Sequence, residues 1–178
     1  MRKVKTGLAG RIKHLSPCAE AVVWLQDWNI PQEAWDACER GDWMLWLLGK
    51  LSGPPESKSR EKLVLASCGC ARLVVHLAAS PNVLMCIEAA ERWANGTGTL
   101  KDLIKARAAA YAAADADAAY AAATAAYTAV YTAAAAADAA TYAADAADAA
   151  YTARREILKK CAYVVRRFYP KVPKIKGN

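Results

Sequence analysis

The sequence predicts an all-α protein, a single-domain bundle in which short tryptophan-rich helices pack against long alanine-rich helices. The strongest observation is the stretch 106–153, where thirty of forty-eight residues are Ala and neither Gly nor Pro occurs. Alanine loses less free energy on entering a helix than any other residue. Elsewhere, apolar residues recur at the three- and four-residue spacing of amphipathic helices, and no stretch alternates convincingly with the two-residue period of a β-strand.

The 178 residues suffice for one domain with a buried core. Gly7 and Gly10 argue against a stable helix at the basic start of the chain, and its basic end is expected to be loose. All six Trp lie before residue 94, so the first half of the domain supplies bulk and the second half supplies length. The expected parts are the lead 1–16, the domain 17–170 with its halves 17–98 and 99–170, and the tail 171–178.

Three short helices are expected at the start of the tryptophan-rich half. The first covers about residues 17–27, where apolar residues recur at helical spacing. Pro31 suits the first turn of the second helix, which Gly41 ends as its C-terminal cap. Asp42 can cap the third, residues 43–51, whose run of apolar side chains predicts burial on most sides at the centre of the core.

Two further helices precede the alanine-rich half. A helix over about residues 57–79 follows a loop that contains two prolines. Ser80 and Pro81 then mark the start of a helix that runs to Ala94, with Ser as cap and Pro in the first turn. Thr99 and Asp102 have the spacing of a capping box, which starts the alanine-rich stretch.

The helical pattern then continues over residues 100–169, which would span roughly 105 Å as a straight helix. A compact chain of this size has a radius of gyration of about 16 Å, so we expect at least one break that folds the stretch into a hairpin. The candidate corners are Asp115, Asp117 and Asp138, because Asp favours helix caps over helix interiors. Four tyrosines would share one side of a continuous helix, either as core or as a binding surface: Tyr120, Tyr127, Tyr131 and Tyr142.

Charge is concentrated at the two ends of the chain. Residues 1–14 hold five Lys or Arg and no acid, and residues 154–178 hold nine against one acid, although the chain as a whole carries only +7. Such ends can hold nucleic acid, or simply aid solubility. The basic start is not followed by a signal-peptide core, and no stretch is apolar enough to span a membrane. We therefore expect a cytoplasmic protein whose six Cys are reduced thiols.

No residue pattern indicates an enzyme, a cofactor or a metal site. Cys68 and Cys70 with His76 suggest metal ligands, but residues two apart do not share a helix face, and a zinc site usually needs two ligand pairs. The plausible working surface is instead a charged corner beside two tryptophans, with an ordinary helix–helix corner as the alternative interpretation. These candidate partner-binding residues are Trp35, Asp36, Glu39, Arg40, Asp42 and Trp43.

Several segments resemble a known family. They are Trp35-Asp-Ala-Cys38, Gly41-Asp-Trp-Met-Leu-Trp-Leu-Leu48, Cys70-Ala-Arg72, Glu88-Ala-Ala-Glu-Arg-Trp93, the Ala-Ala-Asp/Tyr repeats and Cys161-Ala-x-Val-Val-Arg166-x-x-Tyr-Pro170. In these the chain is similar to the immunity proteins predicted in bacterial polymorphic-toxin loci, whose relatives include uncharacterised phage proteins. The resemblance implies an all-helical cytoplasmic inhibitor that binds a toxin or defence effector and occludes it, without catalysis.

Three alternatives stay open. The basic ends could bind nucleic acid, which steep loss of affinity with salt would indicate. A small-molecule sponge would need a deep cavity flanked by Arg or Lys. A structural role would use the Ala- and Tyr-rich helix for self-association into a homo-oligomer, which light scattering would detect.

Overall fold

Helices form every regular element in the part of the chain that the computed structural model describes, residues 7–54, 57–77, 81–112 and 151–175. The all-α prediction is confirmed. No described helix is both long and apolar enough to cross a membrane. The elements are α1 (Leu8–Ile12), the 3-10 turn η1 (Lys13–Leu15), α2 (Ala19–Leu25), α3 (Pro31–Ala37), α4 (Gly41–Leu51), α5 (Lys58–Arg72), the 3-10 turn η2 (Val75–Leu77), α6 (Pro81–Ala94), α7 (Leu100–Ala112) and α10 (Tyr151–Phe168).

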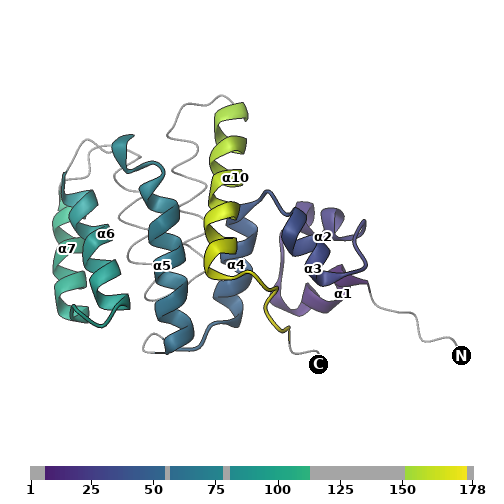
Figure 1. Cartoon of the computed structure of the whole chain (residues 1–178), viewed down its shortest axis with the longest axis horizontal. Helices are drawn as coiled ribbons and strands as arrows, with labels where there is room; N and C mark the ends of the chain where they lie inside the picture. Colours follow the sequence, from purple (N-terminus) through teal and green to yellow (C-terminus); the bar gives the residue numbers. More distant parts are fainter. Residues whose placement is uncertain (1–6, 55–56, 78–80, 113–150, 176–178) are drawn as a thin grey trace, which may run out of the picture.

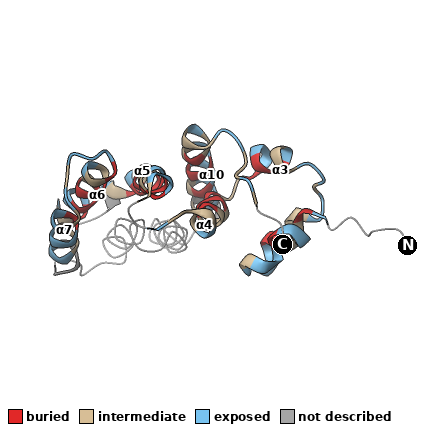
Figure 2. Ribbon diagram, turned by 90° about the horizontal axis from the view of Figure 1, so that it is seen from below, coloured by how far each residue is buried: buried red, intermediate tan, exposed pale blue. Residues whose placement is uncertain are grey.

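The helices stand in a row across the molecule. Figure 1 shows α7, α6, α5 and α10 in that order, with α4 beside α10 and with α1, α2 and α3 grouped at the far end. Figure 2 shows that the buried residues of these helices face their neighbours in the row. The C-terminal segment after α10 runs back towards the group α1–α3, where Val172 is bonded to Gln32 on α3.

Helix α5 joins the two halves of the core because it is buried on two sides. Val64 and Cys68 are fully buried in the core shared with α6 and α7. Leu63 and Cys70 belong to a second core, which α5 builds with α3, α4 and α10. An amphipathic helix normally buries one stripe, so burial on two sides identifies α5 as an internal helix rather than an outer one.

A close approach fixes α4 against α10. A Cβ atom placed on Gly41 would lie 2.4 Å from Cys161 Cβ and 2.6 Å from the backbone nitrogen of Ala162. The prediction that Gly41 ends the second helix as its C-terminal cap is wrong, because Gly41 is the first residue of α4. Asp42 lies in the first turn of α4 and makes no capping bond, since its carboxylate binds the Arg40 guanidinium instead.

The starts of two helices, α6 and α7, were predicted correctly from the sequence. Helix α6 covers Pro81–Ala94, as predicted. The capping box before α7 is also confirmed: Thr99 N donates to Asp102 Oδ2 at 3.2 Å, and Asp102 N donates to Thr99 Oγ1 at 3.1 Å.

Three boundaries differ from the prediction. Helix α5 ends at Arg72 rather than near residue 79, and the chain continues through η2. The lead contains the helix α1 in spite of its glycines, because Leu8 and Ile12 lie one turn apart and both become buried. Residues 171–175 are not loose, since Val172 N donates to Gln32 Oε1 at 2.9 Å.

The middle of the alanine-rich stretch, 113–150, lies outside the described residues. The predicted corners Asp115, Asp117 and Asp138 fall within it, as do the tyrosines 120, 127, 131 and 142.

Candidate functional site

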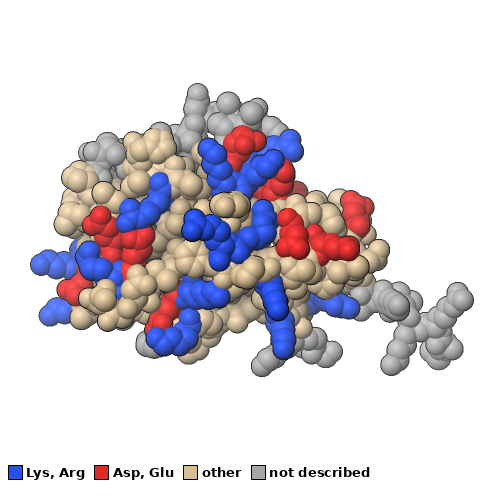
Figure 3. Space-filling view, viewed as in Figure 1, with Lys and Arg blue, Asp and Glu red and all other residues tan. Residues whose placement is uncertain are grey.

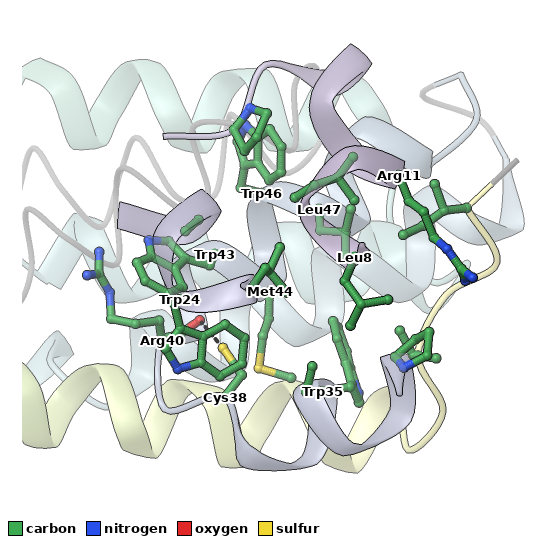
Figure 4. A pocket seen from close by; sticks show the side chains of 18 of the residues that line it. Leu8, Arg11, Trp24, Trp35, Cys38, Arg40, Trp43, Met44, Trp46 and Leu47 are labelled. Atoms are coloured by element: carbon green, nitrogen blue, oxygen red, sulfur yellow. Dashed lines mark hydrogen bonds between the residues drawn. The ribbon is translucent and has the colours of Figure 1, made fainter. Parts of the chain in front are cut away.

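A cavity of about 860 Å³ lies between α1 and α2 on one side and α3, α4 and the segment 172–175 on the other (Figure 4). Its walls are mainly apolar and contain four of the six tryptophans. The lining residues are Leu8, Arg11, Ile12, Ser16, Pro17, Cys18, Glu20, Ala21, Trp24, Leu25, Pro31, Ala34, Trp35, Cys38, Arg40, Asp42, Trp43, Met44, Trp46, Leu47, Val172, Pro173, Lys174 and Ile175.

Helix α4 supplies one wall because its two sides face different surroundings. Leu45 and Leu48 are buried in the core with α5 and α10. Trp43, Trp46 and Leu47, which share the other face at three- and four-residue spacing, are only half-buried and line the cavity. The prediction that residues 43–51 are buried on most sides is therefore only partly right.

Helices α1 and α2 cover the cavity. The side chains of Leu8 and Ile12 are each 6% exposed and lie one turn apart on α1. On α2, the centroid of the Trp24 ring lies 6.0 Å from that of Trp43 on α4 and 5.3 Å from that of Trp28. Ring centroids at such distances are typical of favourable aromatic pairs. The contact between Trp24 and Trp43 therefore holds α2 against α4.

Helix α3 forms the third wall and is tied to the end of α10. Trp35 is 5% exposed, and its indole Nε1 donates to the backbone oxygen of Tyr169 at 2.9 Å. Arg166 on α10 donates to the carbonyl oxygens of Cys38 at 2.7 Å and Trp35 at 3.3 Å. These bonds satisfy the carbonyl groups at the end of α3 and fix the wall before any ligand enters.

One end of the cavity holds a closed ion pair. Arg40 Nε donates to Asp42 Oδ1 at 2.9 Å, a second bond joins Nη2 to Oδ2, and the guanidinium lies 4.3 Å from the Trp43 ring centroid. The bond to Asp42 is the largest cause of the raised pKa of Arg40, and the negative charges of Asp42 and Glu20 raise it further. Arg40 is therefore neutralised by protein groups.

The opposite end is basic. Figure 4 shows Arg40 and Arg11 at opposite ends of the cavity, with Met44 and Leu8 between them in that view. Lys174 lines the cavity from the C-terminal segment. Neither Arg11 nor Lys174 has an acidic partner among the described residues.

The titratable groups of the cavity do not form an activated nucleophile. Burial raises the pKa of the Cys38 thiol to about 11, so this thiol stays protonated near neutral pH. Cys18 is exposed, and the histidines His14 and His76 are exposed and outside the cavity lining. In the described ranges no group of three or more His, Cys, Asp or Glu is arranged to hold a metal ion.

The six predicted partner-binding residues separate into two groups. Trp35, Arg40, Asp42 and Trp43 meet at the cavity. Asp36 instead accepts a bond from Gln32 Nε2 at 2.9 Å on the surface of α3.

The last of the six, Glu39, joins the loop between α3 and α4 to α10 and does not line the cavity. Its carboxylate lies 2.9 Å from Lys159 Nζ and 3.5 Å from Arg155 Nη2. The hydrogen bond from Lys159 is the main reason why the pKa of Glu39 is lowered.

Sequence reasoning missed Trp24, Trp46, Arg11 and Lys174 as site residues. The spacing of Trp43, Trp46 and Leu47 is the only signal that could have indicated a second face on α4. The two basic residues lie far apart in the chain and only the fold brings them to one cavity.

A second surface of interest is basic. Helix α10 exposes Lys160, Tyr163 and Arg167 along one face, and the Tyr163 ring is 63% exposed. Figure 3 shows Lys and Arg side chains gathered over the middle of the molecule, where α10 lies in Figure 1. Lys160 and Arg167 have no acidic partner in the part of the chain that is described.

Comparison of the chain with protein-family models, with curated proteins and with solved structures gives no match.

Proposed function

We propose that this chain is a non-catalytic binding protein that sequesters a small ligand in the tryptophan-lined cavity. The observation that carries the proposal is the cavity itself, about 860 Å³ with apolar walls and a few charged groups at its ends. Sites for small molecules and cofactors are typically concave, mostly apolar and about 300–1,000 Å³ in volume, with few polar groups that fix orientation.

The shape favours a small ligand over the surface of a folded protein. Protein inhibitors typically present about 800 Å² of surface and 20–30 residues to their target. The candidate corner is divided, because Asp36 and Glu39 do not line the cavity and are bonded to Gln32 and Lys159 instead. Arg11 and Lys174 also supply the basic flank that a small-molecule sponge requires.

The resemblance to immunity proteins supports a neutralising role. An immunity or counter-defence protein can neutralise an effector by occluding the effector protein or by removing a small molecule on which the effector depends. We infer the second mode for this chain, since the cavity is concave and its walls are fixed by hydrogen bonds within the protein.

Native mass spectrometry tests this function. The purified chain is mixed with a deproteinised extract of its host, and the mass of the intact protein is compared with and without the extract. We expect a stoichiometric adduct that Trp46→Ala abolishes and Trp93→Ala leaves in place, because Trp93 packs in the other core, away from the cavity. No adduct, or an adduct equally strong with both variants, would remove the proposal.

A second function, nucleic-acid binding, is favoured by the basic face of α10. Single strands are held by cationic grooves with aromatic rings on which bases stack, and Lys160, Tyr163 and Arg167 combine these features. Fluorescence anisotropy with a labelled single-stranded oligonucleotide should then show affinity that falls steeply with salt. Charge reversal at Lys160 and Arg167 should abolish binding, and the same reversal at the exposed Lys101 and Lys105 on α7 should not.

A further inference from the structure

The charges at the two ends of the cavity are unequal. At one end, Arg40 is held by Asp42, and Glu20 lies close enough to Arg40 to raise its pKa. The formal charges there are one positive and two negative, which leaves a net charge of –1. The negative charge would repel an anionic group of a ligand at this end. A cationic group would have to compete for Asp42 with the Arg40 guanidinium, which already binds both carboxylate oxygens.

The Arg11 end has the opposite character. Arg11 comes from α1 and Lys174 from the C-terminal segment, and both line the cavity. Neither has an acidic partner among the described residues, so together they bring a formal charge of +2 to the cavity lining. Guanidinium and ammonium groups together are typical partners of carboxylates, sulfonates and phosphates.

The tryptophan-lined space between the two ends of the cavity suits the aromatic rings of a ligand. Trp24, Trp43 and Trp46 expose part of their rings to the cavity. Aromatic rings pack well on such surfaces, and indole faces favour stacked or tilted partners. Met44 adds a flexible thioether that can adapt to the shape of the ligand.

We propose that the cavity takes an aromatic anion, with its rings among the tryptophans and its anionic group held by the basic lining residues Arg11 and Lys174. This inference rests on the proposed function and gives the chemical class of the ligand. The anionic group can be a carboxylate, a sulfonate or a phosphate, because Arg11 and Lys174 bind the negative oxygen atoms that these groups share.

Two dyes test the proposal separately from the proposed function. Anilinonaphthalene sulfonate is an aromatic anion, and Nile red is an uncharged aromatic dye of similar affinity for apolar sites; the fluorescence of both rises on leaving water. The test variant is Arg11→Gln/Lys174→Gln. The matched control is Lys13→Gln/Lys171→Gln, which removes the same charge at exposed residues that do not line the cavity.

We expect the test variant to bind the sulfonate at least about tenfold more weakly and Nile red as the wild type does. The control variant should bind both dyes normally, and Arg11→Lys/Lys174→Arg should restore sulfonate binding, which also shows that the positions tolerate substitution. Raising the salt concentration should weaken sulfonate binding by the wild type more than by the test variant.

The outcomes separate the two proposals. If both dyes bind the wild type and Trp46→Ala weakens both, but Arg11→Gln/Lys174→Gln changes neither, the cavity binds ligands and the anion preference is wrong. If neither dye binds the wild type, both the cavity function and the anion preference fail.

Discussion

Replacing Gly41 by Ala should destabilise the protein, although the same change stabilises most helices. The added Cβ would lie 2.4 Å from Cys161 Cβ, 2.6 Å from Ala162 N and 2.8 Å from the carbonyl carbon of Cys161. Non-bonded carbon atoms are at their optimum near 3.5–4.0 Å, about 1 Å further apart. Two of the three atoms belong to the backbone of α10, so the relief must come from separation of α4 and α10.

The expected loss follows from two opposing terms. Overpacking of this kind costs about 3 kcal/mol, the upper part of the usual range, and the helix preference of Ala over Gly returns at most about 1 kcal/mol. The net loss of about 2 kcal/mol should lower the urea midpoint by about 1 M if the denaturant slope is near 2 kcal/mol/M.

Urea unfolding followed by far-ultraviolet circular dichroism measures this loss. Gly69→Ala is the matched control on α5, because its Cβ would meet only side-chain atoms, Val164 Cγ1 at 2.8 Å and Phe168 Cε2 at 3.9 Å. A change of the Val164 χ1 angle can relieve this contact without separating two helices. We expect the control to cost less than about 1 kcal/mol. A Gly41→Ala protein as stable as the wild type would refute the close packing of α4 on α10.

Three further predictions follow from single contacts. Trp35→Phe removes the bond from the indole to the Tyr169 oxygen and should cost about 1 kcal/mol in urea unfolding; an unchanged midpoint would contradict that bond. The pKa of Glu39 is lowered in the folded state, so its ion pairs contribute stability above the unfolded pKa and lose it as pH falls through the folded pKa. Glu39→Gln should therefore be less stable than wild type near about pH 7 and equal to it in acid below the usual Glu range, and a difference that persists in acid would need another cause. Burial and the raised pKa of Cys38 predict that iodoacetamide alkylates the exposed Cys18 first in the folded protein; peptide mass spectrometry showing Cys38 modified as fast would place that thiol at the surface.

The helices could be predicted from the sequence where the residues that start a helix act only on their own turn. Pro81 and the pair Thr99 and Asp102 act on their own turns, so α6 and the start of α7 were predicted correctly. Gly41 was misassigned because its role is set by Cys161, which lies one hundred and twenty residues away. No local preference of glycine distinguishes a helix cap from a contact site.

The site was only half predictable for the same reason. Charged residues next to Trp35 and Trp43 indicated the Arg40 end of the cavity. Part of the cover comes from α1, where Gly7 and Gly10 argue against a stable helix, and Lys174 belongs to a tail that was expected to be loose. The C-terminal segment is held to α3 by contacts such as the Val172–Gln32 bond, and α1 is held by burial of Leu8 and Ile12. The periodicity of the sequence does not indicate either contact.

A crystal structure of the chain with bound anilinonaphthalene sulfonate would show whether the cavity binds an aromatic anion. We expect the dye in the cavity, with its rings against Trp46 and Trp43 and its sulfonate within hydrogen-bond distance of Arg11 or Lys174. Dye bound elsewhere, for example at the exposed Met85 and Ile104 of α6 and α7, with the cavity filled by rearranged side chains, would contradict it.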